Sequence, residues 1–338
     1  MGRKSKKSAG ANGNAAGAGI VRALRTMHEQ FLFVPKVGGG YVPRRERYLA
    51  VGMGGSALAP ELLNAADTSL RIVIHRGYGL PTFPRGEWKR YLVLLISYSG
   101  NTEEVLDAFR EARANKCAAV CITTGGILLQ RARDEGVPFI RLPHTNIQPR
   151  MATGYMMRAV LHALGDGAAF QSLGRLARSW RATAFDAPGK KLAGRLYRYT
   201  PIIYASLKNF PIAYNWKIKM NETAKIPAFA NAFPELNHNE MTGFDVRPGT
   251  KPVSARMRFV FLTDTNDHPR IRRRMGATAQ LLAARGFPVE WVALRGRMPF
   301  PAMISSLALA DWTAYHLARR YRVEPEAVPL VEQLKRML

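Results

Sequence analysis

Leu92–Thr102 has the sequence LVLLISYSGNT and joins a run of apolar residues to a turn rich in hydroxyl groups. The five residues Leu92–Ile96 are all apolar, which is typical of a strand buried on both faces of a parallel sheet. Glu103 and Glu104 suit the first turn of a helix, and the apolar residues after them recur on one helical face. The stretch therefore predicts a strand, a glycine-containing loop and a helix N-terminus in direct succession.

The loop Ser97–Thr102 has the features of an anion-binding site. The free N–H groups and the positive dipole end of the following helix point toward the loop, and the hydroxyl groups of Ser97, Ser99 and Thr102 supply further donors. An ordinary capped turn, in which the same side chains only satisfy helix N–H groups, would show the same pattern. The loop alone therefore leaves a phosphate site and a plain helix cap as equal alternatives.

Length and composition describe a globular protein. The chain has 338 residues, enough for two domains that each bury a core, and 47% of its residues are hydrophobic. No apolar run approaches the roughly 20 residues of a membrane helix, and residues 1–19 lack the apolar core of a signal peptide. The spacing of Cys117 and Cys121 fits neither a disulfide nor a zinc site, so two buried thiols are expected. We expect a cytoplasmic protein that does not enter the membrane.

The net charge of +26 is unusually high. Lysine and arginine are spread over the whole chain and cluster only at Arg3–Lys7 and Arg270–Arg274. No helix-turn-helix pattern, aromatic RNA-binding motif or Cys/His finger accompanies them. A solvated basic surface is therefore favoured over a nucleic-acid partner.

Predicted strands and helices alternate in two series, which indicates two doubly wound parallel sheets in an α/β fold. The strands of the first series are expected at residues 47–51, 71–75, 92–96, 118–122 and 139–142, and those of the second at 200–206, 257–263 and 289–294. The polar loop at residues 264–269 of the second series lacks the serine pattern found in the first. We therefore expect one phosphate site per chain, in the first half.

Composition suggests where the domains begin and end. Residues 1–16 contain almost no large apolar side chain and should form a disordered basic tail. The remaining segments are expected to be a first domain, a helical connection, a second domain and a C-terminal tail, at residues 17–165, 166–190, 191–320 and 321–338.

Five motifs occur in a fixed order along the chain. They are Gly52–Ser56, Ser97–Thr102, Ile122–Gly125, Pro149-Arg150, and Asn221-Glu222 followed by Pro234–Asn239. Each motif is weak alone, but the set resembles the archaeal-type bifunctional phosphoglucose/phosphomannose isomerases, over most of the chain from about residue 20. The resemblance implies two flavodoxin-like sugar isomerase (SIS) domains, a phosphorylated sugar as substrate and a homodimer. It implies no cofactor and no metal ion.

The reaction of that family sets clear chemical requirements. An aldose–ketose isomerase opens the sugar ring and then moves a proton between C1 and C2 through a cis-enediol. It needs a carboxylate base, an acid/base for ring opening, and a positive group near the developing enediolate. A phosphate anchor holds the reacting carbons in place.

The resemblance assigns these roles to particular residues. Glu222 matches the catalytic base, and Arg150 matches the arginine near the enediolate oxygens. His238 matches a ring-opening histidine that the partner subunit supplies, and Lys335 matches a lysine that assists ring opening. The phosphate-binding positions correspond to Gly54, Gly55, Ser56, Ser97, Ser99 and Thr102.

Two alternatives remain open at this point. Glu222 has the helical spacing of a surface residue paired with Lys219 or Lys225. The whole chain could also be a non-catalytic sugar-phosphate-binding regulator built on the same cradle. Residues 1–46 are too short and irregular for a DNA-reading module, and a regulator has no use for Glu222 and His238 together.

One position departs from the family pattern. The family commonly has a threonine seven residues before the lysine that corresponds to Lys335, and this chain has Val328 there. The threonine is associated with the acceptance of both C2 epimers. We therefore expect glucose 6-phosphate to be preferred over mannose 6-phosphate.

Overall fold

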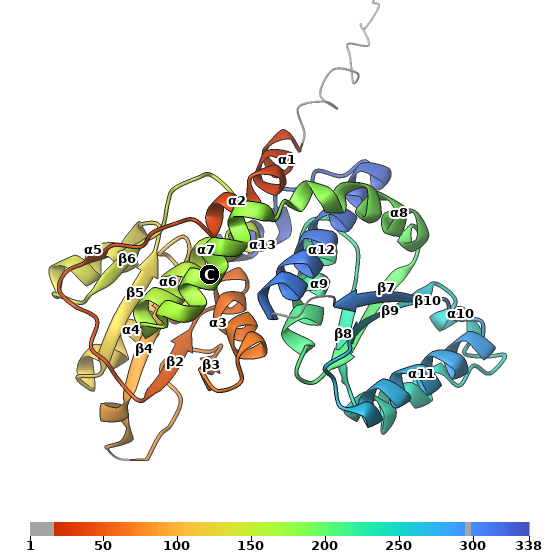
Figure 1. Ribbon diagram of the computed structural model, residues 1–338, viewed down its shortest axis with the longest axis horizontal. Helices are drawn as coiled ribbons and strands as arrows, with labels where there is room; N and C mark the ends of the chain where they lie inside the picture. The colour runs from red at the N-terminus through yellow and green to blue at the C-terminus, as the bar shows by residue number, and fades with distance from the viewer. Residues whose placement is uncertain (1–16, 85, 295–298, 338) are drawn as a thin grey trace, which may run out of the picture.

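The computed structural model describes residues 17–84, 86–294 and 299–337. Two parallel sheets lie side by side with helices between and outside them (Figure 1). The predicted α/β class with two doubly wound sheets is confirmed. The predicted disordered tail, residues 1–16, lies outside the described residues.

The first sheet has the strand order β1-β6-β5-β4-β2-β3. Its strands are β1 (Val37–Gly38), β2 (Arg47–Val51), β3 (Val73–His75), β4 (Tyr91–Ile96), β5 (Ala118–Thr123) and β6 (Phe139–Arg141). All neighbours pair in parallel except β1, which runs antiparallel to β6. Every residue of β4 is buried, because this strand is internal to the sheet and both of its faces are covered by helices.

The second sheet is smaller and entirely parallel, in the order β10-β9-β7-β8. Its strands are β7 (Thr200–Ser206), β8 (Phe229–Phe233), β9 (Met257–Asp264) and β10 (Val289–Leu294). The sequence did not predict β8. This strand is a short edge strand with an asparagine at its centre and a half-exposed face, so it lacks the continuous apolar run of an internal strand.

Helices of both halves share the layer between the two sheets (Figure 1). This layer contains α3 (Gly55–Ala66), α6 (Thr153–Leu164), α9 (Phe210–Glu222) and α12 (Pro299–Tyr321). Their apolar side chains, such as Leu58, Met157, Trp216 and Leu307, belong to one continuous core that touches both sheets. The two halves are therefore held together by a common hydrophobic layer.

Separate cores cover the outer face of each sheet. On the first sheet, α4 (Glu103–Ala114) and α5 (Gly126–Asp134) pack Phe109 and Leu128 against β4 and β5. On the second, α11 (Pro269–Ala284) packs Met275 against β9. The order of layers is thus outer helices, first sheet, shared helices, second sheet, outer helix.

The remaining elements connect these layers or cover their ends. The helices are α1 (Ala18–Arg25), α2 (Met27–Gln30), α7 (Gly167–Ser179), α8 (Asp186–Leu196), α10 (Lys251–Ser254) and α13 (Pro329–Lys335). The short 3₁₀ turns are η1 (Glu87–Arg90), η2 (Pro149–Met151), η3 (Ala182–Phe185), η4 (Glu235–Asn237) and η5 (Glu240–Phe244). Within the described residues, no helix combines the length and apolarity needed to cross a membrane.

Both cysteines are free thiols in the interior of the first domain, as predicted. Cys121 lies in β5 and is fully buried, and Cys117 immediately precedes that strand. Burial raises the pKa of both thiols, that of Cys117 to about 11, because the charged thiolate would lose its solvation. Neither thiol therefore has the character of a reactive nucleophile.

Candidate active site

The topology of the first sheet selects one place for a ligand. Strands β2 and β4 are neighbours in the sheet, although β3 lies between them in the sequence. The chain leaves β2 into the inner layer through α3 and leaves β4 into the outer layer through α4. The loops after these two strands therefore diverge, and such a switch point is where open α/β sheets bind ligands.

The two loops at this point, Gly52–Gly55 and Ser97–Thr102, are joined by hydroxyl groups. The Ser56 Oγ, at the start of α3, accepts a hydrogen bond from the Tyr98 N–H at 3.1 Å. The Ser97 Oγ accepts one from the Gly100 N–H at 3.0 Å and lies 2.7 Å from the Thr102 Oγ1. The loops thus form one surface lined by hydroxyl groups, which we name the cradle.

The predicted phosphate-binding residues differ in how they contribute to the cradle. Ser97 is fully buried and holds the turn together, whereas Ser99 is exposed and Thr102 is half-buried. Gly100 has a φ of 76°, and a Cβ there would lie 1.8 Å from the carbonyl oxygen of Gly125. The third motif, Ile122–Gly125, therefore supports the cradle from the end of β5 by close packing.

The cradle lies directly against the turn that carries Arg150. A Cβ on Gly55 would lie 2.8 Å from the Arg150 nitrogen and 2.8 Å from the Pro149 carbonyl carbon. Only a glycine lets the start of α3 approach the backbone of η2 this closely. The family-like glycine motif thus places the phosphate loop beside the candidate catalytic arginine.

Arg150 is the centre of the candidate site. Its side chain is only 1% exposed. The Nε donates to the Thr223 Oγ1 at 3.1 Å, and the Nη1 donates to the Glu222 Oε2 at 3.0 Å. The Nη2 donates to the carbonyl oxygens of Pro325 and Glu326, at 2.7 and 2.9 Å. Within the described chain, these bonds occupy all but one of the N–H groups of the guanidinium.

Burial and charge act in opposite directions on this arginine. Desolvation lowers the pKa of Arg150, and the charge of Glu222 raises it again. The carboxylate thus favours the charged form of a guanidinium that has lost almost all contact with water.

Glu222 is the last residue of α9, and its side chain is 35% exposed. A carboxylate at the negative end of a helix dipole is unfavourable, and the ion pair with Arg150 offsets that effect. The alternative pairing with Lys219 or Lys225 does not occur. The Lys219 Nζ binds the Asp311 Oδ1 at 2.8 Å, and the Lys225 Nζ donates to the backbone carbonyl of Glu222.

His238 and Lys335 lie apart from this pair. His238 is exposed and follows η4, at the carboxyl end of β8. Lys335 is exposed at the end of α13 and pairs with Glu332 at 2.9 Å. In the part of the chain that the structure describes, neither side chain bonds to Arg150 or Glu222. The structure therefore brings together the cradle, Arg150 and Glu222, and the roles of His238 and Lys335 stay predictions.

The corresponding place in the second sheet carries buried carboxyl groups. Strands β7 and β9 are neighbours there, and Asp264 and Asp267 are buried where their loops meet. The Ser206 Oγ donates to the Asp267 Oδ1 at 2.6 Å, and burial raises the pKa of Asp267. Two carboxyl groups at this position suit a phosphate less well than the hydroxyl groups of the cradle.

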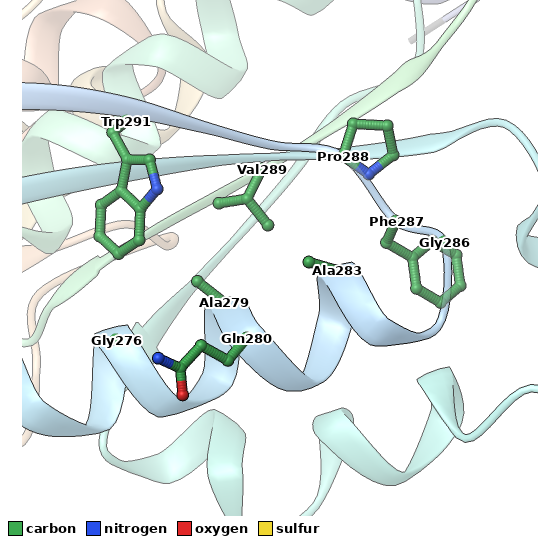
Figure 2. Close-up of a pocket in the computed structure, with 9 residues that line it drawn as sticks. All are labelled: Gly276, Ala279, Gln280, Ala283, Gly286, Phe287, Pro288, Val289 and Trp291. Carbon is green, nitrogen blue, oxygen red and sulfur yellow. The ribbon is translucent and has the colours of Figure 1, made fainter.

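One surface groove among the described residues does not suit a sugar phosphate. It lies between α11 and the edge strand β10 and has a volume of about 580 Å³ (Figure 2). Its lining is mainly apolar, with Ala279, Ala283 and Val289 beside a 52% exposed Trp291.

The described residues also contain no group of three or more His, Cys, Asp and Glu side chains that could hold a metal ion.

Two parallel-sheet domains, with a hydroxyl-lined cradle at the switch point of the first, define a protein of the sugar isomerase (SIS) type. A family profile described as the bacterial phospho-glucose isomerase C-terminal SIS domain matches residues 185–338. The C-terminal domain of glucosamine-fructose-6-phosphate aminotransferase from Francisella tularensis has a similar structure. Its TM-score is 0.69 at 12% identity, with 94% of this chain and 100% of that chain covered, which supports the fold alone.

Relatives of known name identify the family. The chain is 32% identical over 296 residues to a bifunctional phosphoglucose/phosphomannose isomerase of Aquifex aeolicus, covering 85% of this chain and 88% of the relative. It is 30% identical over 323 residues to a protein of the same name from Thermoplasma acidophilum, covering 93% and 96%. The chain belongs to the family of bifunctional phosphoglucose/phosphomannose isomerases.

The close approach of Gly55 to Arg150 gives a testable prediction. Gly55→Ala should lower kcat by about 100-fold, because the added Cβ displaces the turn that holds Arg150 and a shift of about 1 Å is enough for such a loss. Gly276→Ala is the matched control, since a Cβ there meets no atom within 4 Å. Steady-state kinetics of both variants test this, and wild-type turnover in Gly55→Ala would show that the contact does not position the site.

Proposed function

We propose that this protein is an aldose–ketose isomerase that interconverts glucose 6-phosphate and fructose 6-phosphate, with mannose 6-phosphate as a slower second aldose. The relatives that share about 30% of its residues carry the name of this activity. The observation that carries the proposal is the ion pair of Arg150 and Glu222 at 3.0 Å, beside a phosphate cradle.

The proposed mechanism begins with the phosphate. The hydroxyl groups of Ser99 and Thr102, with the N–H groups at the start of α4, hold the phosphate and so fix the distance to the reacting carbons. Ser97 and Ser56 keep the two loops in register. The substrate then extends from the cradle toward η2, where Gly55 contacts the Arg150 backbone.

Proton transfer is assigned to Glu222. With the sugar in its open-chain form, the carboxylate removes the proton from C2, and the electron pair moves into the C1–C2 bond to give the cis-enediolate. A proton then moves from O2 to O1, and return of the first proton from Glu222 to C1 gives the ketose. Arg150 holds the carboxylate in place, and its remaining N–H group is available to a substrate oxygen as negative charge develops.

Ring opening is assigned to His238 and Lys335. His238 is exposed at the end of β8, where a second subunit can approach it. This exposure supports a homodimer in which each subunit donates its histidine to the site of the other. Lys335 lies nine residues beyond Glu326, whose carbonyl is held by Arg150, so the C-terminal segment starts at the site. We place this homodimer in the cytoplasm.

A non-catalytic sugar-phosphate-binding regulator is less well supported. Such a protein needs the cradle, but it does not need a carboxylate held by a buried arginine beside that cradle. Burying the Arg150 guanidinium costs desolvation free energy. A reaction in which the Glu222 carboxylate takes part explains why the chain retains this buried pair.

Glu222→Gln tests the proposed function. The amide has the size of the carboxylate but cannot accept the C2 proton, so kcat should fall at least about 100-fold with KM nearly unchanged. A coupled assay that measures glucose 6-phosphate formed from fructose 6-phosphate gives both constants. Glu135→Gln is the control, because it removes one carboxylate from the remote pair with Arg113 at 3.0 Å. Retention of more than about a tenth of the turnover would refute Glu222 as the base.

The cradle is tested by a second pair of substitutions. Ser99→Ala with Thr102→Ala should raise KM for fructose 6-phosphate about tenfold or more, because each lost hydrogen bond to a charged group is worth about 1.5–3 kcal/mol. Ser69→Ala, which removes an exposed hydroxyl from the turn after α3, should leave KM unchanged. An unchanged KM in the double variant would mean that the phosphate binds elsewhere.

The position of Val328 gives a prediction about the preference between the C2 epimers glucose 6-phosphate and mannose 6-phosphate. It is half-buried at the start of α13, two residues after Glu326, whose carbonyl accepts a hydrogen bond from Arg150. Acceptance of both C2 epimers needs room and a polar group or water near C2, and the valine methyl groups disfavour both. We expect kcat/KM for glucose 6-phosphate to exceed that for mannose 6-phosphate by at least about tenfold, or about 1.4 kcal/mol. Val328→Thr should narrow the difference, and equal wild-type values would contradict the argument.

A further inference from the structure

A buried ion pair lies behind the candidate site and has no role in the proposed proton transfer. The Lys219 Nζ of α9 lies 2.8 Å from the Asp311 Oδ1 of α12, and the two side chains are 2% and 3% exposed. Burial lowers the pKa of Lys219 and raises that of Asp311, because desolvation disfavours both charges, while each charge opposes the shift of the other. Removing both charges from water costs free energy, so we expect a function that requires the pair.

Lys219 makes a further contact that points to that use. Its Nζ also donates to the backbone carbonyl of Arg150 and lies 3.7 Å from the Met151 Sδ. The Lys219 ammonium therefore binds both Asp311 and the main chain of η2, the turn that contains Arg150. The guanidinium of Arg150 also donates a hydrogen bond to Glu222, which lies about one helical turn after Lys219 on α9.

These contacts connect η2 to the end of α9 twice, once through the main chain of Arg150 and once through its side chain. The end of α9 holds the backbone of Arg150 through Lys219, and Arg150 holds the end of α9 through Glu222 and Thr223. Asp311 fixes the Lys219 ammonium from the opposite side. Both ends of the Arg150 residue, main chain and side chain, are thus fixed to the helix that carries the base.

We propose that Lys219 and Asp311 are positioning residues for the isomerisation, which hold the Arg150 backbone so that its guanidinium orients Glu222. This proposal rests on the proposed function of the site. The Lys219 Nζ is occupied by Asp311, the Arg150 carbonyl and the Met151 Sδ, so Lys219 acts through Arg150.

A purely structural role for the pair is the alternative. The pair also links α9 to α12, but the same two helices are joined by the Trp216 Nε1, which donates to the Ser306 Oγ at 3.0 Å, and by a continuous apolar core. Buried ion pairs can often be replaced by apolar side chains without loss of stability. A link between the helices alone therefore does not require charged groups.

The test replaces both charges at once. Lys219→Met with Asp311→Leu leaves no unpaired buried charge, and the melting temperature should equal or exceed that of the wild type. We expect kcat for fructose 6-phosphate to fall about 10- to 100-fold, because the Arg150 backbone loses its anchor. KM should stay within about twofold, because the interaction lost acts on the reacting end and the cradle is unchanged. Ser306→Ala is the matched control, since it removes a bond between the same helices without touching η2.

The activities of these variants decide whether Lys219 and Asp311 are positioning residues. Wild-type kcat in the folded double variant, or an equal loss of kcat in Ser306→Ala, would overturn it. If the double variant does not fold, Asp311→Asn, which keeps the shape of the side chain, should lower kcat with KM unchanged, and full activity in that variant would overturn the proposal as well.

A crystal structure of the variant separates this proposal from the proposed function. In the double variant, the Arg150 Nη1 and the Glu222 Oε2 should no longer be within hydrogen-bond distance, compared with 3.0 Å in the intact chain. An unchanged pair would refute the positioning role whatever the activity is. A wild-type protein without isomerase activity would refute the proposed function, while this distance would still decide the role of Lys219 and Asp311.

Discussion

A guanidinium can be buried only where hydrogen-bond acceptors surround it, and Arg150 imposes this constraint on two distant parts of the chain. Glu222 and Thr223 supply a carboxylate and a hydroxyl from the end of α9, and the segment before α13 supplies two backbone carbonyls. If one of these acceptors moved away, a donor would lose its partner in an interior that water barely reaches. The geometry of the site thus depends on one side chain.

The site also depends on which helix ends meet beside η2. The N-terminus of α3, at Gly55, brings the positive end of its dipole to the cradle, where a phosphate is favoured. The C-terminus of α9 brings Glu222, whose charge is unfavourable at that end until Arg150 compensates it. The two helices belong to different halves of the chain but to the same layer (Figure 1). The shared core therefore joins the cradle from one half of the chain to the Glu222 carboxylate from the other.

The sequence predicts those parts of this arrangement that depend on local pattern. Continuous apolar runs correctly indicated the internal strands β4, β5, β7 and β9, and the order of motifs indicated the family. The edge strand β8 was missed because its packing is one-sided, so its residues do not form an apolar run. The pair of Lys219 and Asp311 was missed because its residues are far apart in the chain. The hydrogen bonds from Arg150 to backbone carbonyls were missed because every residue has a carbonyl, so no residue type indicates them.

The comparison of the two halves explains why a duplicated architecture has a single site. Both sheets have the same switch point, and in both a strand ends in a polar turn that leads into a helix of the shared layer. In the first half the turns present hydroxyl groups and glycine backbone, whereas in the second they bury Asp264 and Asp267. In the proposed function, the carboxyl groups disfavour a phosphate there, so the substrate is anchored in only one orientation. In the proposed mechanism the second half supplies the base, Glu222, from the end of α9, and the sugar extends from one half of the chain to the other.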